Sequence, residues 1–313
     1  MSMNSVFAAG GRDKLNQKSG PMPDCAAPMA AQILDGKSLA ASIRADLRER
    51  VAALVQRGVR PGLAVVLAGD DAASRVYVRN KTLAAAEIGV HSEQHEFKAD
   101  VGEATLLQQI RALNENPLVH SILVQLPLPK HIDSARVLEA IAPAKDVDGF
   151  HEVNLGALLA GRPGVVPCTP AGVMRLIENA GVPLAGRHAV VLGRSNIVGK
   201  PVALLLLQKD ASVTICHSKS KDLKAITKQA DILVAAVGRA KLVTAEMVKP
   251  GACVIDVGIN RLPDGKLAGD VDYEAVREVA GWITPVPGGV GPMTIAMLLE
   301  NCLRAAARQK PAA

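Results

Sequence analysis

The chain has 313 residues, of which 49% are apolar, 21% charged and only 2% aromatic. This length is sufficient for two domains, and their core must be aliphatic because three Phe, two Tyr and one Trp cannot fill it. The shortage of aromatic rings argues against single-strand nucleic-acid binding, which depends on base stacking. The net charge of +6 comes from scattered basic residues, so we expect anionic small molecules rather than nucleic acid as ligands.

The first 30 residues mix Gly, Pro, Asn, Ser and Asp without a period. This composition predicts a disordered extension at 1–30. A transit peptide is the alternative, but the segment has few basic residues, includes Asp13 and Asp24, and shows no amphipathic stripe.

An alternating series of helices and strands begins after this extension. Apolar residues recur at three- and four-residue steps from residue 36 to Gly58, which predicts an amphipathic helix. Short apolar or alternating runs then predict strands near 63–68, 91–97 and 121–126, with helices near 73–88 and 102–115 between them. This order implies parallel β-α-β units.

A second series follows a Pro-rich, charged stretch at 127–148, so we place a domain boundary near 148–152. Its predicted strands are 188–192, 212–216, 232–237, 253–257 and a short one near Trp282. A broad apolar face then predicts a final helix at 291–308. The predicted fold class is α/β, with two α/β domains at 31–149 and 150–290.

The turn from Gly193 to Gly199 lies between a predicted strand and a predicted helix. This is the context in which backbone N–H groups and a helix N-terminus bind a pyrophosphate, so the second domain is predicted to be a Rossmann-like parallel sheet. Ser195 stands where the usual fingerprint has its second glycine, and an ordinary β-α turn remains the alternative.

The segment after the second strand of that domain favours NADP over NAD. An NAD site usually has an acidic residue at this strand end, whereas here no carboxylate precedes Asp222. Basic and hydroxyl side chains that suit a 2′-phosphate are present instead, at Arg194, Ser218, Lys219 and Lys221. A solvated basic loop is the alternative interpretation.

Tyr77 and Lys81 are four residues apart, on one face of a predicted helix. A lysine can act as a general acid or base, and a tyrosine hydroxyl can hydrogen-bond a reacting group. By itself, such a pair is more often part of an exposed helix face than of a site. Short-chain dehydrogenases also use Tyr-x-x-x-Lys, but they place it after their glycine-rich turn, whereas here it comes about 110 residues before Gly193.

Other polar residues interrupt apolar or Pro-rich segments. Gln125 ends a buried strand, where ligands of open α/β sheets bind, although it could instead be a capping amide. Asp146 and Asp148 could bind Mg²⁺, but no further carboxylates support a metal, so we expect none. Cys168 has no indicated His or Asp partner, so a cleft wall is a simpler role than a nucleophile.

The five cysteines form no CxxC pair, and an odd number is no disulfide framework, which indicates a reducing, cytoplasmic setting. The longest apolar runs, such as 202–207, reach about a third of the roughly 20 residues that a membrane span needs. We therefore expect no membrane association.

Taken in order, several motifs resemble one family closely, the bifunctional methylenetetrahydrofolate dehydrogenase/methenyltetrahydrofolate cyclohydrolases. The motifs are SRVYVRNK at 74–81, VQLPLP at 124–129, KDVDG at 145–149, PCTPAG at 167–172, GRSNIVGKP at 193–201, VGIN at 257–260 and TPVPGGVGPMT at 284–294. The likeness runs from about Ala31 to Ala307.

The resemblance implies NADP-dependent oxidation of 5,10-methylenetetrahydrofolate and hydrolysis of the product to 10-formyltetrahydrofolate. It implies a folate-binding catalytic domain at 31–149, joined by a returning C-terminal helix at 291–308, and an NADP-binding domain at 150–290. It also implies a homodimer.

The family's residues carry over by motif. Lys81, Tyr77, Gln125 and Asp148 fall on its catalytic positions, and the last three also on its folate contacts together with Pro287 and Gly288. The nucleotide contacts fall on Gly193, Arg194, Ser195, Ser218 and Ile259.

Three alternatives remain open. The enzyme could have kept only one activity, which intact Lys81 and Gly193 argue against. It could be another two-domain NADP oxidoreductase, which turnover of folate substrates would distinguish. It could also be a nucleotide-binding regulator without activity, although the sequence contains no regulatory or DNA-reading element.

Overall fold

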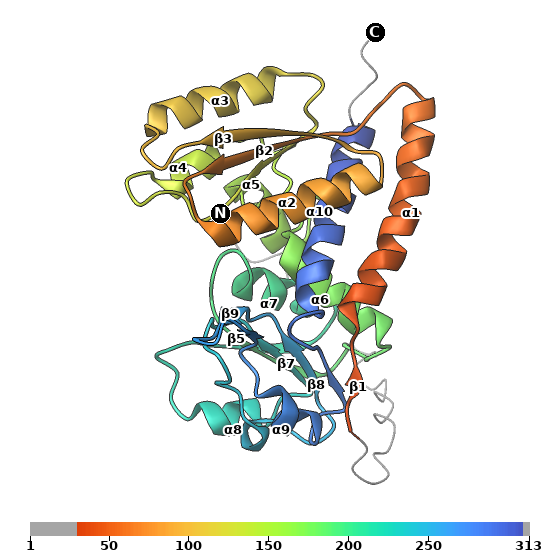
Figure 1. Ribbon diagram of the computed structural model, residues 1–313. Coiled ribbons are helices and arrows are strands. Elements are labelled where there is room, and N and C mark those ends of the chain that lie inside the picture. The colour runs from red at the N-terminus through yellow and green to blue at the C-terminus, as the bar shows by residue number, and fades with distance from the viewer. Residues whose placement is uncertain (1–29, 309–313) are drawn as a thin grey trace, which may run out of the picture.

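The computed structural model describes residues 30–308 and contains two separate parallel sheets, each covered by helices (Figure 1). The predicted disordered extension lies outside the described residues except for residue 30. The predicted α/β class with two α/β domains is confirmed.

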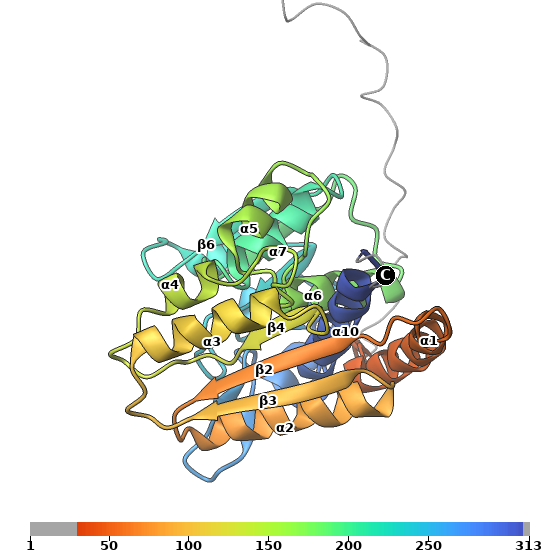
Figure 2. The same cartoon turned by 90° about the horizontal axis from the view of Figure 1, so that it is seen from above.

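The smaller sheet has the strand order β3-β2-β4, and all its pairings are parallel. Its strands are β2 (Gly62–Ala68), β3 (His91–Phe97) and β4 (Ser121–Val124). Every residue of β2 is buried, because this central strand is covered on both faces. Figures 1 and 2 show α2 (Ala72–Glu87) and α3 (Glu103–Glu115) on opposite faces.

The larger sheet has six parallel strands in the order β1-β11-β8-β7-β5-β6. They are β1 (Gln32–Ile33), β5 (His188–Leu192), β6 (Ser212–Cys216), β7 (Ile232–Ala235), β8 (Cys253–Asp256) and β11 (Trp282–Ile283). Leu192 pairs with both Cys216 and Ala235, and Ala235 pairs with Asp256. The carboxyl ends of four strands therefore meet at one edge of the sheet.

Strand β1 differs from the sequence-based domain prediction. Residues from 31 onward were assigned to the first domain, but Gln32 and Ile33 pair with Trp282 and Ile283 at the edge of the larger sheet. The chain thus starts beside the second sheet and then enters α1 (Gly36–Gln56). Two-residue pairings at a sheet edge leave too short a pattern for sequence analysis to detect.

Helix α10 (Val290–Arg308) returns to the first domain, as the family resemblance implied. It packs against α1 and α6 (Cys168–Asn179) and also contacts α2, β2 and β4. Gly172 lets α6 approach closely, since a Cβ atom there would lie 2.8 Å from the Cβ of Met293. Buried apolar residues on most sides of α10 make it the central element between the two sheets (Figure 1).

The remaining elements are short. They are α4 (Ser134–Glu139), α5 (Glu152–Leu159), α7 (Gly199–Leu207), α8 (Leu223–Thr227), η1 (Ala245–Met247), α9 (Tyr273–Arg277) and the antiparallel pair β9 (Asn260–Arg261) and β10 (Leu267–Ala268). Across residues 30–308, no helix is both long enough and apolar enough to span a membrane.

Candidate active site

A cleft made of two adjoining cavities is lined by both parts of the chain. The first, which we call the lysine cavity, has a volume of about 360 Å³ and is lined by Lys81, Gln125 and Asp148 among others. The second, the proline cavity, has about 470 Å³ and includes Pro285 and Pro287. Both cavities share the lining residues Tyr77, Val257, Ile259, Val290, Gly291 and Ile295.

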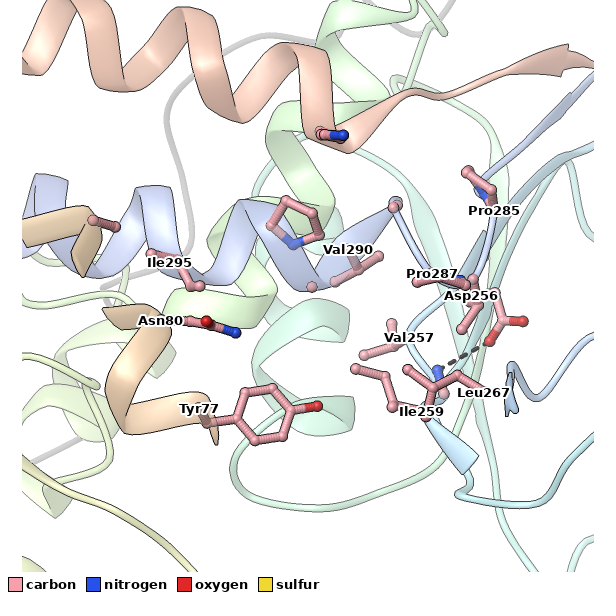
Figure 3. A pocket seen from close by; sticks show the side chains of 18 of the residues that line it. Tyr77, Asn80, Asp256, Val257, Ile259, Leu267, Pro285, Pro287, Val290 and Ile295 are labelled. Atoms are coloured by element: carbon pink, nitrogen blue, oxygen red, sulfur yellow. Dashed lines mark hydrogen bonds between the residues drawn. The ribbon is translucent and has the colours of Figure 1, made fainter. Parts of the chain in front are cut away.

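Helix α2 positions Tyr77 and Lys81 on the cleft. Lys81 lies on the buried face of the helix and is only 8% exposed, whereas Tyr77 is 38% exposed. Figure 3 shows the Tyr77 ring pointing toward Val257 and Ile259 across the cleft. Lys81 therefore does not lie on an exposed helix face, which was the alternative interpretation of the pair.

Gln125 directly follows β4 and contacts Lys81. The Lys81 Nζ donates to Gln125 Oε1 at 3.1 Å, and Gln125 Nε2 donates to the Leu126 carbonyl at 2.7 Å. The second bond assigns the amide orientation, so that its oxygen faces the lysine. Gln125 is thus a partner of Lys81 and not merely a capping amide.

Asp148 also lines the lysine cavity and is partly accessible from it. Burial raises the pKa of its carboxyl group from 3.8 to about 6; the positive charge of Lys81 partly opposes this shift, and the negative charge of Asp146 adds to it. The site therefore brings together a lysine, an amide and a carboxyl group whose proton affinity is increased.

Asp146 has a different role from Asp148. It is 2% exposed, and its carboxylate accepts hydrogen bonds from Gly149 N, His151 N and Asn154 Nδ2 at 2.8 to 3.0 Å. It therefore fixes the loop that carries Asp148, and its oxygens are not directed together with Asp148 at a metal. Among residues 30–308, no group of three or more His, Cys, Asp or Glu is arranged to hold a metal ion.

Cys168 and Asn301 hold the same loop from two helices. Cys168 Sγ donates to the Val147 carbonyl at 3.3 Å, and Asn301 Nδ2 donates to the carbonyls of Val147 and Val166 at 3.0 Å. Burial, with the nearby charge of Asp148, raises the pKa of the Cys168 thiol well above its usual range, so it is a poor nucleophile. Sequence analysis missed Asn301, since it lies in an otherwise apolar helix far from the motif.

A third cavity, of about 430 Å³, surrounds the turn that begins at Gly193; we call it the glycine-turn cavity. Gly193 has φ +118°, and a Cβ atom there would lie 2.2 Å from the Ala236 carbonyl oxygen, so only glycine fits. Ser195 Oγ accepts from the N–H groups of Val198 and Gly199 at 3.2 and 3.3 Å. The serine therefore caps the start of α7.

The other walls of this cavity include Arg194 and Ser218, whereas Lys219 and Lys221 do not line it. Sequence analysis missed His217, Ser220 and Arg239, which do line it. In the described part of the chain, the lining residues include basic and hydroxyl side chains but no carboxylate. This donor set is suited to a phosphorylated nucleotide.

The other predicted site residues lie in the cleft. Ile259 lines both the lysine cavity and the proline cavity, and Pro287 and Gly288 line the proline cavity. The predicted positions thus divide between the cleft and the glycine-turn cavity.

A parallel sheet with a glycine turn at its carboxyl edge, beside a cleft with a buried lysine, is typical of two-domain nucleotide-binding enzymes of the α/β class. Comparison with known proteins identifies it further. Residues 34–148 match the tetrahydrofolate dehydrogenase/cyclohydrolase catalytic domain, and residues 167–310 match the NAD(P)-binding domain of the same family. The chain belongs to this family, which confirms the family predicted from the motifs.

Individual relatives align with this chain along nearly their whole length. The chain is 61% identical over 280 residues to the bifunctional protein FolD of Polaromonas sp., covering 90% of this chain and 100% of that one. The crystal structure of the bifunctional enzyme from Campylobacter jejuni is 49% identical with a TM-score of 0.88, covering 89% of this chain and 99% of that one. The Trypanosoma brucei enzyme, solved with NADP and an inhibitor, is 43% identical with a TM-score of 0.86, covering 90% and 98%.

Proposed function

We propose that the cleft holds a tetrahydrofolate substrate, that the glycine-turn cavity holds part of NADP, and that Lys81 moves the proton in the hydrolytic step. As a member of its family, the enzyme oxidises 5,10-methylenetetrahydrofolate with NADP and hydrolyses 5,10-methenyltetrahydrofolate to 10-formyltetrahydrofolate. The observation that carries the proposal is the contact of Lys81 with Gln125 beside Asp148.

The folate ring is proposed to lie in the lysine cavity, against Tyr77, Gln125 and Asp148. Amide and carboxyl groups there match the polar edge of a pterin, and the aromatic ring of Tyr77 offers a flat apolar contact. The rest of the substrate would extend along Pro287 and Gly288 into the proline cavity. That cavity is also lined by Lys37 and Arg44, whose charge suits the carboxylates of the glutamate tail.

NADP is proposed to contact Gly193, Arg194, Ser195 and Ser218 at its phosphorylated adenosine end, and Ile259 at its nicotinamide end. When bound, NADP accepts the hydride that leaves the methylene carbon. The chain itself contributes alignment, because Ile259 lies in the same cleft as Tyr77 and Lys81.

Hydrolysis needs a proton acceptor. Water attacks the methenyl carbon, and the Lys81 amine, once it has released its own proton, takes the proton that the water loses while Gln125 Oε1 holds the lysine nitrogen in place. That proton then passes to the ring nitrogen as its bond to the carbon breaks. The hydroxyl group left on the carbon loses its own proton to the solvent, which gives the formyl group on the other nitrogen and releases one proton overall. Lys81 ends the cycle neutral.

The subunit organisation belongs to the same proposal. We assign residues 31–149 with 291–308 to folate binding, apart from the edge strand β1, and residues 150–290 to NADP binding.

Large apolar side chains are exposed on neighbouring elements at the β6 edge, namely Val153, Leu159, Leu207 and Ile215. Such a patch supports a homodimer formed through this edge.

The cellular location is proposed to be the cytoplasm. Cys168, Cys216, Cys253 and Cys302 are all free and buried. Free thiols in a structural role suit a reducing compartment.

Lys81→Met tests the proposal for the hydrolytic step. We expect cyclohydrolase activity to fall by at least 100-fold while the Kd for NADP changes less than twofold, since the lysine lies in the folate cleft. Arg79→Met is the matched control, because Arg79 is an exposed basic residue on the same helix. An equal loss of NADP binding and hydrolysis in Lys81→Met would contradict the division of roles.

Arg194→Ala tests the nucleotide site. We expect the preference for NADP over NAD to fall at least tenfold, with cyclohydrolase activity retained. Lys219→Ala is the control, as Lys219 lies nearby without lining the cavity. Unchanged NADP preference in Arg194→Ala would remove this residue from the 2′-phosphate site.

A further inference from the structure

Two buried aspartates, Asp256 and Asp270, lie between the glycine-turn cavity and the cleft and take no part in the chemistry described above. Asp256 ends β8 and is 2% exposed, and Asp270 is fully buried in the segment after β10. Buried carboxylates are costly unless they are hydrogen-bonded, so their partners indicate their role.

The Asp270 carboxylate holds three consecutive main-chain N–H groups. Val237 N and Gly238 N donate to its Oδ2 at 2.6 and 3.0 Å, and Arg239 N donates to its Oδ1 at 2.8 Å. Successive N–H groups aimed at one point form a concave anion site, which this side chain fills. Val237 and Arg239 line the glycine-turn cavity, so Asp270 determines the position of that wall.

The same carboxylate also holds a wall of the cleft. Asn260 Nδ2 donates to Asp270 Oδ1 at 2.9 Å, and Asn260 directly follows Ile259. The main chain passes very close here, since a Cβ atom on Gly258 would lie 2.3 Å from Asp270 Oδ1. One side chain thus joins the turn after β7 to the segment after β8.

Asp256 in turn fixes the main chain of Asp270. Its Oδ1 accepts from Asp270 N and its Oδ2 from Val271 N, both at 2.9 Å. It also accepts from Gly258 N at 3.0 Å, the bond drawn in Figure 3 below Pro287. Asp270 is therefore anchored at its backbone as well as at its side chain.

We propose that Asp270 is a positioning residue that sets the distance between the two ends of the NADP site, the 237–239 turn at the adenosine end and Ile259 at the nicotinamide end. This inference rests on the proposed placement of NADP. A dinucleotide spans both ends, so its affinity depends on their spacing, whereas a ligand for one end is nearly insensitive to it. Hydrolysis needs no NADP and depends on Lys81, which lies in the cleft away from the 237–239 turn, so it should be less sensitive to Asp270 than NADP binding is.

Asp270→Asn tests the inference, because an amide has the same shape but turns a donor toward N–H groups that need an acceptor. Calorimetric titration should show NADP binding at least tenfold weaker, and binding of adenosine 2′,5′-bisphosphate less than threefold weaker. Cyclohydrolase activity, which depends on Lys81, should fall by a smaller factor than NADP binding does. Asp264→Asn is the matched control, since Asp264 is exposed and precedes Asp270 in the same chain segment.

Equal losses for NADP and the bisphosphate, unchanged NADP affinity, or a parallel loss of cyclohydrolase activity would each overturn the inference. If Asp270→Asn does not fold, Asn260→Ala takes its place, since it removes one donor and leaves the carboxylate. It should weaken NADP binding about threefold and leave the bisphosphate unaffected; unchanged NADP binding would again overturn it. Failure of the wild-type enzyme to bind NADP would instead refute the proposed function.

Discussion

Asp148→Asn should remove a site of electrostatic strain from the folded enzyme. Burial raises the pKa of Asp148 from 3.8 to about 6, so the folded state favours the neutral acid. Because the folded-state pKa is raised, this contribution to stability is fully present below about pH 4 and is lost as the pH rises through about 6. An asparagine stays neutral at every pH.

The magnitude follows from the size of the shift. The full shift, from 3.8 to about 6, corresponds to at most about 3 kcal/mol in the free energy of unfolding. At pH 5, about one unit below the folded-state pKa, the folded wild type mostly keeps the proton while the unfolded chain is mostly ionised, which is worth about 1 kcal/mol. At pH 8 both states are ionised and this contribution is absent.

Urea denaturation of wild type and Asp148→Asn at pH 5 and pH 8 provides the assay. The change in unfolding free energy caused by the substitution should be about 1 kcal/mol more favourable at pH 8 than at pH 5. Both enzymatic activities should be lost. Asp100→Asn, at an exposed turn, should show no such difference between the two pH values. A substitution effect on stability that is equal at both pH values, or less favourable at pH 8, would refute the reasoning.

Three further predictions concern the supporting residues. Asn301→Leu leaves the carbonyls of Val147 and Val166 without this donor and should lower the unfolding free energy by about 2 kcal/mol in urea denaturation. An unchanged unfolding free energy would contradict a stabilising role for these two hydrogen bonds. Ser195→Ala removes the hydroxyl group that caps α7 and should lower the unfolding free energy by about 1 kcal/mol in the same assay. Ser218→Ala is the control, because it leaves this cap intact. Iodoacetamide at pH 8 should leave Cys168 unmodified in the folded enzyme, and peptide mapping that finds it alkylated would contradict its burial and raised pKa.

Much of the fold could be predicted because its strands are apolar runs of the right length. The predicted strands 188–192 and 212–216 coincide with β5 and β6, since each is bounded by turn residues. The predicted strands that end at 126, 237 and 257 are each too long. The apolar pattern continues into loop residues after the hydrogen bonding of β4, β7 and β8 has ended. The pairing of β1 with β11 joins residues about 250 positions apart and has no local pattern.

The site residues could be predicted where a motif assigns a residue type to one chemical role. Lys81 and Gln125 are 44 positions apart, and their contact came within reach only through the motifs of the family, not from periodicity. The basic loop after β6 shows the opposite limit. Composition alone favoured Lys219 and Lys221 equally with Ser218, but of these three residues the loop places only Ser218 on the cavity wall.

Buried aspartates show how the same residue type supports both structure and chemistry. Asp146 and Asp270 each hold several N–H donors, which offsets the cost of burying a carboxylate and rigidifies the loop around it. Asp148 is different: in the part of the chain that the structure describes, its carboxylate accepts a hydrogen bond from no main-chain N–H. Its oxygens therefore remain free to face the lysine cavity, and the unfavourable burial that they retain is the reason that this position should gain stability when it loses its charge.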